Sequence, residues 1–435
     1  MTTSSMAGMT AAVSARRDGH SVAAASGHNH VPALDGIRGL AIVLVLFFHF
    51  MLIAGNGVGH RLIQKTWGYG WAGVDLFFVL SGFLITGILL DAKAKRPTSW
   101  DFFKNFYARR TVRIFPLYYA FLVVFLLILP SVMTGFYDLY GRPPTGEWTY
   151  WTYTYNLFQG HHQGPREFSH AMGVTWSLCI EEQFYLLWPT IVWLCRPRTL
   201  LKLCAGLIVM SMIARGLVWH YSGYLVFATQ WTFCRMDPLA IGAAIAISTR
   251  IAPDTVRSLR KYAIHLLWLV PVTLVGWNAK VGTLTQSNVF LVGGYTALAA
   301  MFGALLLVTI TANGAGPFVS VFSNPLLRLF GRLSYAIYLF NQPVKYALLK
   351  YVWHFDDPTQ EFTSLAPQII FFLVATALTV ALAWLSWHLF EKHFLKLKDW
   401  FPMSGPKKRT IHSAPEGVVS TAEGTNSPQA AAAAS

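Results

Sequence analysis

The chain has 435 residues, of which 54% are hydrophobic and 12% charged, and its mean hydropathy is +0.45. These values exclude an ordinary soluble globular protein, because such proteins carry about a quarter charged residues. The formal net charge of +15 would suit nucleic acid only if the basic residues formed one patch. They alternate between loops instead, so we exclude nucleic acid as a partner.

The four cysteines, at positions 179, 195, 204 and 234, lie in or beside apolar segments without CxxC spacing, which predicts neither a disulfide framework nor a zinc site. Residues 1–32 are polar and have no apolar stretch before a cleavage site. We expect a flexible cytoplasmic tail there rather than a signal peptide. Residues 33–395 are expected to form the membrane domain, and residues 396–435 a basic, then Ser/Ala-rich, disordered cytoplasmic tail.

Apolar segments of membrane-spanning length follow one another through this domain. They cover residues 34–54, 71–90, 114–134, 173–194, 199–219, 225–247, 263–279, 289–311, 326–352 and 367–390. The predicted fold class is all-α: a polytopic integral membrane protein with about ten transmembrane helices. With the N-terminus inside, roughly 23 Lys and Arg residues fall in cytoplasmic segments and about five in external ones, as the positive-inside rule requires. We therefore expect both termini in the cytoplasm and the protein in the inner (plasma) membrane.

The first apolar segment carries two polar side chains that are costly in a bilayer, Arg38 and His49. They are eleven residues apart, so on a helix they share one face, about 16 Å apart along the axis. Ionisable groups inside a membrane segment normally face a protein interior or a water-filled cavity and mark functional sites. A structural interpretation is also open, in which His49 makes a helix contact and Arg38 extends to the lipid headgroups.

Two basic or histidine-containing segments suggest ligand contacts. FYARRTVRIFPLYY places Arg109, Arg110 and Arg113 at the cytoplasmic end of the third span. Such residues flank membrane helices in general, but three within five positions also suit an anion site, because guanidinium groups pair with phosphate through two hydrogen bonds; we prefer the anion site. The long external loop 135–172 holds three histidines, His161, His162 and His170. Their spacing does not suit helical metal ligands, so we expect a polar, substrate-facing rim and no metal site.

Two adjacent acidic residues, Glu181 and Glu182, lie inside the fourth span together with Tyr185. Neighbouring helical residues face different directions, so at most one of the two carboxylates is expected to point into a given cavity. Charges at this depth need partners, and Arg38, the Arg110 cluster and Arg235 are candidates. For Glu182 we prefer a structural ion pair.

Polar residues in three other spans complete the set. In the second span Asp75 is expected to bridge to a neighbouring helix or loop, and Ser81 with Gly82 to allow close helix packing. In the sixth span Arg235 and Asp237 precede a proline that interrupts the helix, so they are expected to line a cavity. The ninth span holds four polar side chains, Ser334, Tyr335, Tyr338 and Asn341.

Six segments, taken together, resemble the membrane acyltransferase-3 family, integral-membrane enzymes that O-acylate sugars and related acceptors. In chain order they are LDGIRGLAIVLVLFFHF, GVDLFFVLSGFLI, FYARRTVRIFPLYY, TWSLCIEEQFYLLWP, RMDPLAIGAAIA and GRLSYAIYLFNQP. The resemblance covers nearly the whole membrane portion. It implies an enzyme that moves an acyl group, expected to be acetyl, from cytoplasmic acyl-CoA to a hydroxyl of an extracytoplasmic carbohydrate or glycoconjugate.

The resemblance also implies site residues, position by position. The family's Arg-x10-His pattern falls on Arg38 and His49, with His49 the presumed catalytic residue, and its Arg-x-x-Arg pattern on Arg110 and Arg113, which handle the donor. We predict three groups: catalytic His49, Arg38 and Glu181; donor-binding Arg109, Arg110 and Arg113; and substrate-binding Tyr185, Arg235, Asp237, Ser334 and Tyr338. The chain departs from many relatives at Asn341, where they have histidine, and in FEKHF, where they have a proline after the acidic residue.

His49 would act as general base toward the acceptor hydroxyl or accept the acyl group itself. Acyl-CoA is expected as co-substrate, with no permanently bound cofactor, and the acceptor as a glycan, a glycolipid or a small hydroxylated molecule. A secondary transporter or proton-coupled carrier is the alternative function, since it also combines broken helices with intramembrane charges. A catalytically inactive assembly partner is a third. The sequence leaves the acyl chain length and the oligomeric state open, a homo-oligomer included.

Overall fold

The computed structural model describes residues 31–55, 57–141, 146–158, 171–281, 287–312, 314, 316–355 and 360–402. Within these ranges the chain is helical and contains no β-strand, and an isolated parallel bridge joins Ile53 to Phe362. The predicted all-α class is confirmed for this part of the chain. The three loop histidines and most of both predicted tails lie outside the described residues. Of the tail residues that are described, Pro32 already opens the first helix, and residues 396–400, predicted to be disordered, form a 3-10 helix.

The first half of the domain begins with α2 (Pro32–His49), α3 (Val58–Trp67), the 3-10 helix η1 (Gly68–Ala72) and α4 (Gly73–Ala94). It continues with α5 (Ser99–Leu122), the π-helical η2 (Val123–Ile128), α6 (Leu129–Val132), α7 (Phe136–Tyr140), α8 (Trp148–Trp151), α9 (Tyr155–Phe158) and α10 (Thr175–Leu194). Local signals place the helix starts. Pro32 sits in the first turn of α2, where it removes no helical hydrogen bond, and the Thr98 side chain caps α5 by accepting from the Asp101 amide, 3.1 Å away.

The second half contains α11 (Pro197–Ser222), α12 (Leu225–Gln230), the 3-10 helix η3 (Thr232–Arg235), α13 (Met236–Ile251), α14 (Pro253–Val281), the π-helical η5 (Phe290–Gly294) and α15 (Tyr295–Ile310). The chain then forms α16 (Pro317–Phe322), α17 (Pro325–Tyr351), α18 (Leu365–Ser386), the π-helical η6 (Trp387–Glu391), α19 (Lys392–Leu395) and the 3-10 helix η7 (Lys396–Trp400). The cap of α17 is Asn324, whose side chain accepts from the Leu326 amide at 2.8 Å.

A helix overlaps each of the ten predicted spans, but only part of them meet the criteria for a membrane span. Six helical stretches in the described residues are long and apolar enough to cross a bilayer: Pro32–His49, Val58–Ala94, Ser99–Val132, Pro197–Ser222, Phe290–Ile310 and Leu365–Trp400. The others are short, as α13 is with 16 residues, or carry charged residues along their length. The chain is thus a multi-pass membrane protein, and its ten-span count and orientation stay predictions.

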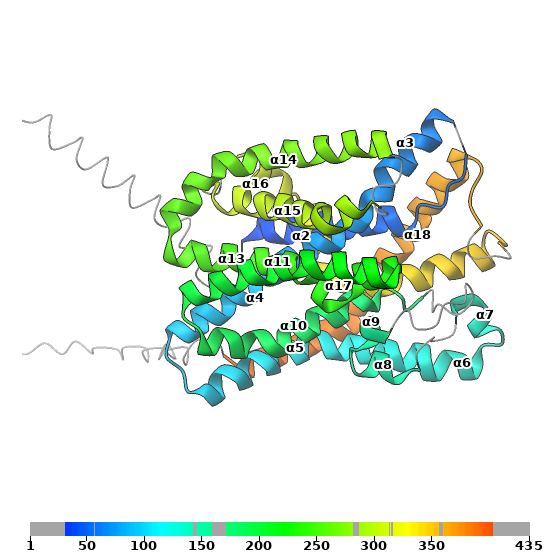
Figure 1. Cartoon of the computed structure of the whole chain (residues 1–435). Coiled ribbons are helices and arrows are strands. Elements are labelled where there is room, and N and C mark those ends of the chain that lie inside the picture. Colours follow the sequence, from blue (N-terminus) through cyan, green and yellow to red (C-terminus); the bar gives the residue numbers. More distant parts are fainter. Residues whose placement is uncertain are drawn as a thin grey trace, which may run out of the picture.

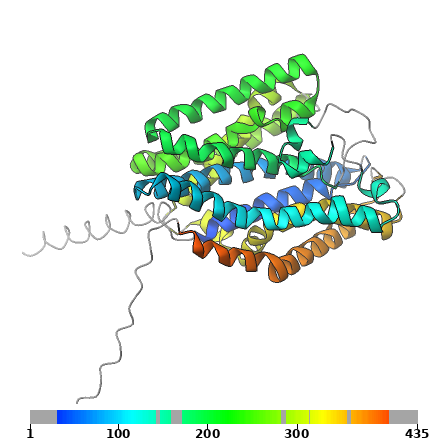
Figure 2. The same ribbon diagram turned by 90° about the horizontal axis from the view of Figure 1, so that it is seen from below.

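Outward-facing apolar side chains mark the lipid-exposed faces of the bundle. Figure 2 shows α18 (orange) along one outer face and α11 (green) at the opposite one. On α11, Ile213 and Leu217 are more than half exposed, and on α18 so are Ile370 and Leu373. Apolar surface of this extent suits contact with lipid rather than water.

Glycines bring the central helices into backbone contact. A Cβ atom at Gly39 of α2 would overlap the Leu327 carbonyl oxygen of α17, and one at Gly331 of α17 would overlap the Asp35 carbonyl oxygen of α2. The same holds for Gly82 of α4, which meets the Leu239 carbonyl of α13, so the predicted close packing at Gly82 is confirmed. Such contacts are the usual way in which membrane helices pack, and they fix α2 against α17 and α4 against α13.

The short helices gather at one end of the bundle. In Figure 1 α3 lies at the upper right and α7, α8 and α9 at the lower right, all toward the end where α2 finishes with His49. The beginning of α2, with Arg38, lies toward the other end. The site described below therefore extends along α2 and its neighbour α17.

Candidate active site

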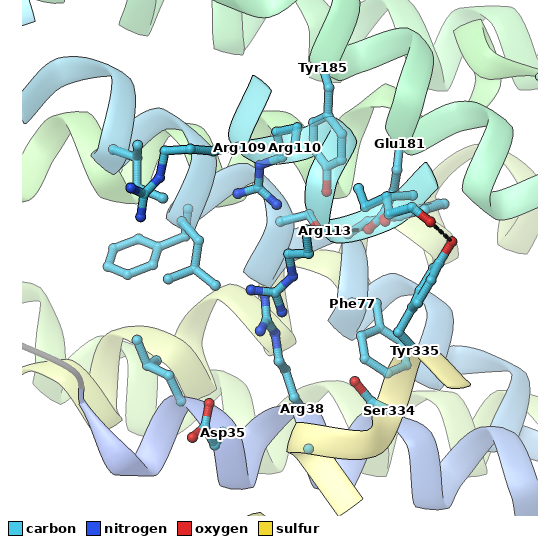
Figure 3. Close-up of a pocket in the computed structure, with 18 of the residues that line it drawn as sticks. Asp35, Arg38, Phe77, Arg109, Arg110, Arg113, Glu181, Tyr185, Ser334 and Tyr335 are labelled. Carbon is cyan, nitrogen blue, oxygen red and sulfur yellow. Dashed lines mark hydrogen bonds between the residues drawn. The ribbon is translucent and has the colours of Figure 1, made fainter. Parts of the chain in front are cut away.

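A cavity of about 700 Å³ opens among α2, α4, α5, α10 and α17 (Figure 3), a volume typical of small-molecule sites. Eight predicted site residues line it: Arg38, Arg109, Arg110, Arg113, Glu181, Tyr185, Ser334 and Tyr338. The C-terminal helices close another part of the wall. The π-helical turn η6 directs both Trp387 and Glu391 to the cavity, and Leu395 of α19 follows.

Three arginines converge in the cavity without an acidic partner. Arg110 and Arg113 are three residues apart on α5 and share a face, and Arg38 extends from α2 so that its guanidinium meets that of Arg113 (Figure 3). The Arg110 Cζ atom lies 5.1 Å from the centre of the Tyr185 ring, a cation–π contact. In the described ranges no carboxylate forms an ion pair with any of these three arginines. Cations grouped in this way favour a bound anion.

Arg109 has a different environment, although it also borders the cavity. Its Nη1 donates to the backbone carbonyl oxygens of Lys398 and Phe401, each at 3.1 Å. Asn105, one turn earlier on α5, donates to the Pro402 carbonyl oxygen at 3.0 Å. Arg109 therefore holds the C-terminal segment against α5, a contact that its predicted role in donor binding did not anticipate.

Both acidic residues of α10 line the cavity. The expectation that at most one would face it is wrong, because the cavity is wide enough to reach residues about 100° apart around a helix. Glu181 accepts a hydrogen bond of 2.5 Å from the Ser81 hydroxyl of α4, so Ser81 has a polar contact besides its place in helix packing. The predicted ion pair of Glu182 is not found among the described residues.

The ninth predicted span contributes one wall through α17. Ser334, Tyr335 and Tyr338 all line the cavity. The Tyr335 hydroxyl donates to the Ile114 carbonyl oxygen at 3.2 Å, and the Tyr338 hydroxyl lies 2.6 Å from the Ser177 hydroxyl of α10. These contacts tie α17 to α5 and α10 around the cavity.

His49 does not line this cavity. It is the last residue of α2, about 16 Å of helix rise beyond Arg38. Its Nδ1 lies 2.6 Å from the Oδ1 of Asn341, which is fully buried on α17. Since Asn341 is only three residues past Tyr338, the inner end of the cavity comes within about one helical turn of the His49–Asn341 pair.

Arg235 and Asp237 do not line the cavity either, so the prediction that they line one is not met here. Both are engaged in buried ion pairs. Arg235 Nη2 lies 2.6 Å from Asp75 Oδ1, which confirms the predicted helix bridge of Asp75. Asp237 Oδ1 lies 2.9 Å from Arg215 Nη1, with both side chains fully buried. Each of the two residues therefore has an ion-pair partner within the bundle, and nothing in this geometry supports substrate binding by the pair.

Reasoning from the sequence missed several residues that form buried ion pairs or line the cavity. Arg215 of α11 was overlooked as the partner of Asp237, although a single arginine inside an apolar segment is a signal of such pairing. At the cavity wall, Arg250 forms a two-pronged pair with Asp91, at 2.7 Å and 2.8 Å. Both residues lie at ends of apolar spans, where they look like ordinary flanking charges. Four other polar residues that line the cavity were not assigned: Asp35, Ser177, Arg332 and Glu391.

The described residues contain no group of three or more His, Cys, Asp or Glu side chains that could hold a metal ion. The cysteines are not joined in disulfides.

The chain was compared with known proteins. The family model Acyl_transf_3, described as an acyltransferase domain, matches residues 31–388. The peptidoglycan O-acetyltransferase OatA of Listeria monocytogenes is 28% identical over 332 residues, which cover 72% of this chain and 49% of that protein. The putative peptidoglycan O-acetyltransferase YrhL of Bacillus subtilis is 27% identical, covering 84% of this chain and 55% of the relative.

A putative O-acetyltransferase of Staphylococcus aureus is 24% identical, covering 87% of this chain and 60% of the relative. The chain thus spans about half the length of the curated relatives it matches. No solved structure matches it. Because the family model extends over most of the membrane domain, and the cavity gathers the arginines and acidic residues of the matching segments, the chain belongs to the Acyl_transf_3 family of acyltransferase enzymes.

Proposed function

We propose that the protein transfers an acetyl group from acyl-CoA, bound in the arginine-lined cavity, to a hydroxyl of a cell-envelope glycan near His49. The observation that carries the proposal is the convergence of Arg38, Arg110 and Arg113 at one end of a helix that ends in His49, with no carboxylate of the described residues paired to them. A donor that carries several phosphates would bind at the arginine end of this helix, and an acceptor without phosphates would bind at the His49 end.

The cavity suits the donor in charge and size. Guanidinium groups bind phosphate oxygens through paired, charge-assisted hydrogen bonds, and three of them line the cavity without an ion-pair partner among the described residues. The cavity volume of about 700 Å³ lies within the range of sites that enclose small molecules. With the N-terminus inside, as the loop charges predict, the Arg38 end of α2 would open to the cytoplasm, where acyl-CoA is available.

The acceptor is inferred from the relatives. Two of them are named as peptidoglycan O-acetyltransferases, so we propose a sugar hydroxyl of a cell-wall glycan as the acceptor and acetyl as the acyl group. The His49 end of α2 lies at the same end of the bundle as the short helices α3, α7, α8 and α9 (Figure 1), and this end would form the surface that an external glycan meets. The matched segment covers about half of each of these two relatives.

In the reaction, the acceptor oxygen attacks the thioester carbonyl carbon, and the carbon–sulfur bond breaks to release the CoA thiolate. His49 would accept the hydroxyl proton and return it to the thiolate. If His49 instead took the acyl group, its nitrogen would form the bond to the carbonyl carbon first, and the acceptor would then attack the acyl-imidazole. In both routes a neutral imidazole nitrogen has to face the reacting atoms.

The test is thiol release from acetyl-CoA by the purified protein in detergent, with and without envelope glycan. Wild type should release thiol in an acceptor-dependent way, and His49→Ala should do so about 10²–10⁴-fold more slowly while it still binds CoA. His60→Ala, on the neighbouring helix α3, is a matched histidine control and should retain activity. Binding of CoA without any transfer to glycan would contradict the proposed reaction, and equal rates for wild type and His49→Ala would remove His49 from it.

A further inference from the structure

His49 and Asn341 form a polar contact at the junction of two tightly packed helices. The Asn341 side chain is fully buried, and its Oδ1 is 2.6 Å from the His49 Nδ1. Glycine contacts hold α2 and α17 at backbone distance. The relative position of the two side chains is therefore fixed by the fold rather than by a flexible loop.

The orientation of the Asn341 amide follows from its other hydrogen bonds. Its Nδ2 donates to the carbonyl oxygens of Ile337, at 3.2 Å, and Tyr338, at 2.6 Å. Both hydrogens of the amide nitrogen are thus used within α17. A flipped amide would point its oxygen at two carbonyl oxygens with no hydrogen between them, which leaves buried acceptors unsatisfied. The amide oxygen therefore faces His49.

An amide oxygen only accepts hydrogen bonds, so the His49 nitrogen that faces it has to carry a hydrogen. A neutral imidazole has one N–H, and if Nδ1 carries it, Nε2 has the free lone pair. An asparagine without the two carbonyl contacts could rotate and donate to Nδ1, which would select the opposite tautomer. The backbone of α17 thus determines, through Asn341, which nitrogen of His49 is basic.

We propose that Asn341 is a positioning residue that holds His49 as the Nδ1–H tautomer and leaves Nε2 as the atom that takes the proton of the acceptor hydroxyl. The proposal rests on the proposed function. The acceptor O–H bond breaks, the proton moves to Nε2, and the oxygen forms a bond to the thioester carbon as the thiolate leaves. The imidazolium then has both nitrogens protonated, and its Nε2 returns the proton to the thiolate.

The surroundings of the pair suit a neutral partner. Lys345 lies one turn after Asn341 on α17, on the same face of the helix. A nearby cation disfavours the imidazolium, and an uncharged amide on Nδ1 stabilises it less than a carboxylate would. A carboxylate in place of the amide would favour it, so Asn341 keeps the ring ready to accept a proton rather than already protonated.

The experiment compares wild type, Asn341→Leu, Asn341→Asp, His49→Ala and a control, Gln342→Leu. Gln342 is a buried neighbour on α17 that forms no hydrogen bond with His49 in the described part of the chain. The rate of thiol release is measured as a function of pH with saturating acetyl-CoA and glycan. Asn341→Leu has a similar size but no acceptor, so its kcat should fall by about tenfold or more. Asn341→Asp should retain activity at high pH, with the acidic limb of its profile displaced to higher pH by about one unit.

A second readout does not depend on activity. Nitrogen NMR of histidine-labelled protein, with the His49→Ala spectrum subtracted, should show a neutral His49 with its hydrogen on Nδ1, and Asn341→Leu should lose that preference. A His49 signal of the Nε2–H tautomer in wild type would overturn the proposal. The proposal would also be overturned if both Asn341 variants kept the pH profile and the kcat of wild type while His49→Ala was inactive. If His49→Ala keeps full activity, the proposed function of His49 fails, and the role of Asn341 fails with it. Should Asn341→Leu not fold, the displaced limb of Asn341→Asp and the wild-type spectrum decide.

Discussion

Replacing Arg113 by glutamine is expected to weaken the binding of CoA but not to destabilise the protein without ligand. Arg113 faces the cavity, and no acidic side chain of the described residues pairs with it. A guanidinium that binds phosphate through charge-assisted hydrogen bonds contributes about 1.5–3 kcal/mol. Its loss should raise the Kd for CoA roughly 10- to 150-fold, since about 1.4 kcal/mol corresponds to a factor of ten.

The ligand-free protein should respond in the other direction. The guanidinium groups of Arg38 and Arg113 point toward each other (Figure 3), and two unit charges about 4 Å apart repel by about 1 kcal/mol in water. Neutralising one of them removes this repulsion. The Arg113→Gln protein without ligand should therefore unfold at the same temperature as wild type or slightly above it, while CoA stabilises it less.

Both effects are measured on one preparation, by calorimetric titration with CoA and by thermal unfolding in the same detergent. Arg257→Gln is the matched control, because Arg257 pairs with Asp254 on α14 and does not line the cavity. The reasoning is refuted if Arg113→Gln binds CoA as well as the control does. It is also refuted if the ligand-free variant loses stability by more than about 1 kcal/mol, since Arg113 would then hold the fold rather than await an anion.

Two further substitutions separate binding from structural roles. Asp237→Ala leaves the fully buried Arg215 without its carboxylate partner and should destabilise the protein by about 3–5 kcal/mol in chemical or thermal unfolding. Arg215→Met combined with Asp237→Leu should recover much of that loss. If Asp237→Ala instead left stability unchanged and raised the KM, Asp237 would be assigned to substrate binding. Arg109→Gln should free the carbonyls of Lys398 and Phe401, so amide hydrogen exchange over residues 396–402 should accelerate. The affinity for CoA should fall less than in Arg113→Gln. A larger loss of affinity than in Arg113→Gln would assign Arg109 to donor binding instead.

The elements that local sequence determines were predicted well. Long apolar runs with interspersed charges identify membrane helices, and a helix is found at each predicted span. Arg110 and Arg113 share a face because of helical spacing alone, and both line the cavity. Glycine after Ser81 predicted close packing, and Gly82 meets the α13 backbone. In each case the signal lies within one or two turns of the residue concerned.

The sequence alone did not predict which buried polar side chains pair with one another, because the pairing depends on which helices pack together. Arg235 was considered a partner for the glutamates of α10, but it pairs with Asp75, 160 residues earlier in the chain. Asn341 attracted attention only as a departure from related sequences, yet it contacts His49 across 292 residues. Neither pairing leaves a pattern in a single sequence, since any of several buried charges or amides could satisfy the same local rule.

The cavity and the His49–Asn341 pair lie on the same two helices, so helix geometry bounds the path between them. Tyr338 lines the cavity with its side chain and accepts from Asn341 with its carbonyl oxygen, and three residues of helix advance by about 4.5 Å. The backbone contacts at Gly39 and Gly331 leave α2 and α17 no room to approach further. If the proposed function holds, an acyl group therefore has to advance by about one helical turn past the Tyr338 phenol. The Tyr338 hydroxyl is held in place by its contacts with the Ser177 hydroxyl and the Val174 carbonyl oxygen.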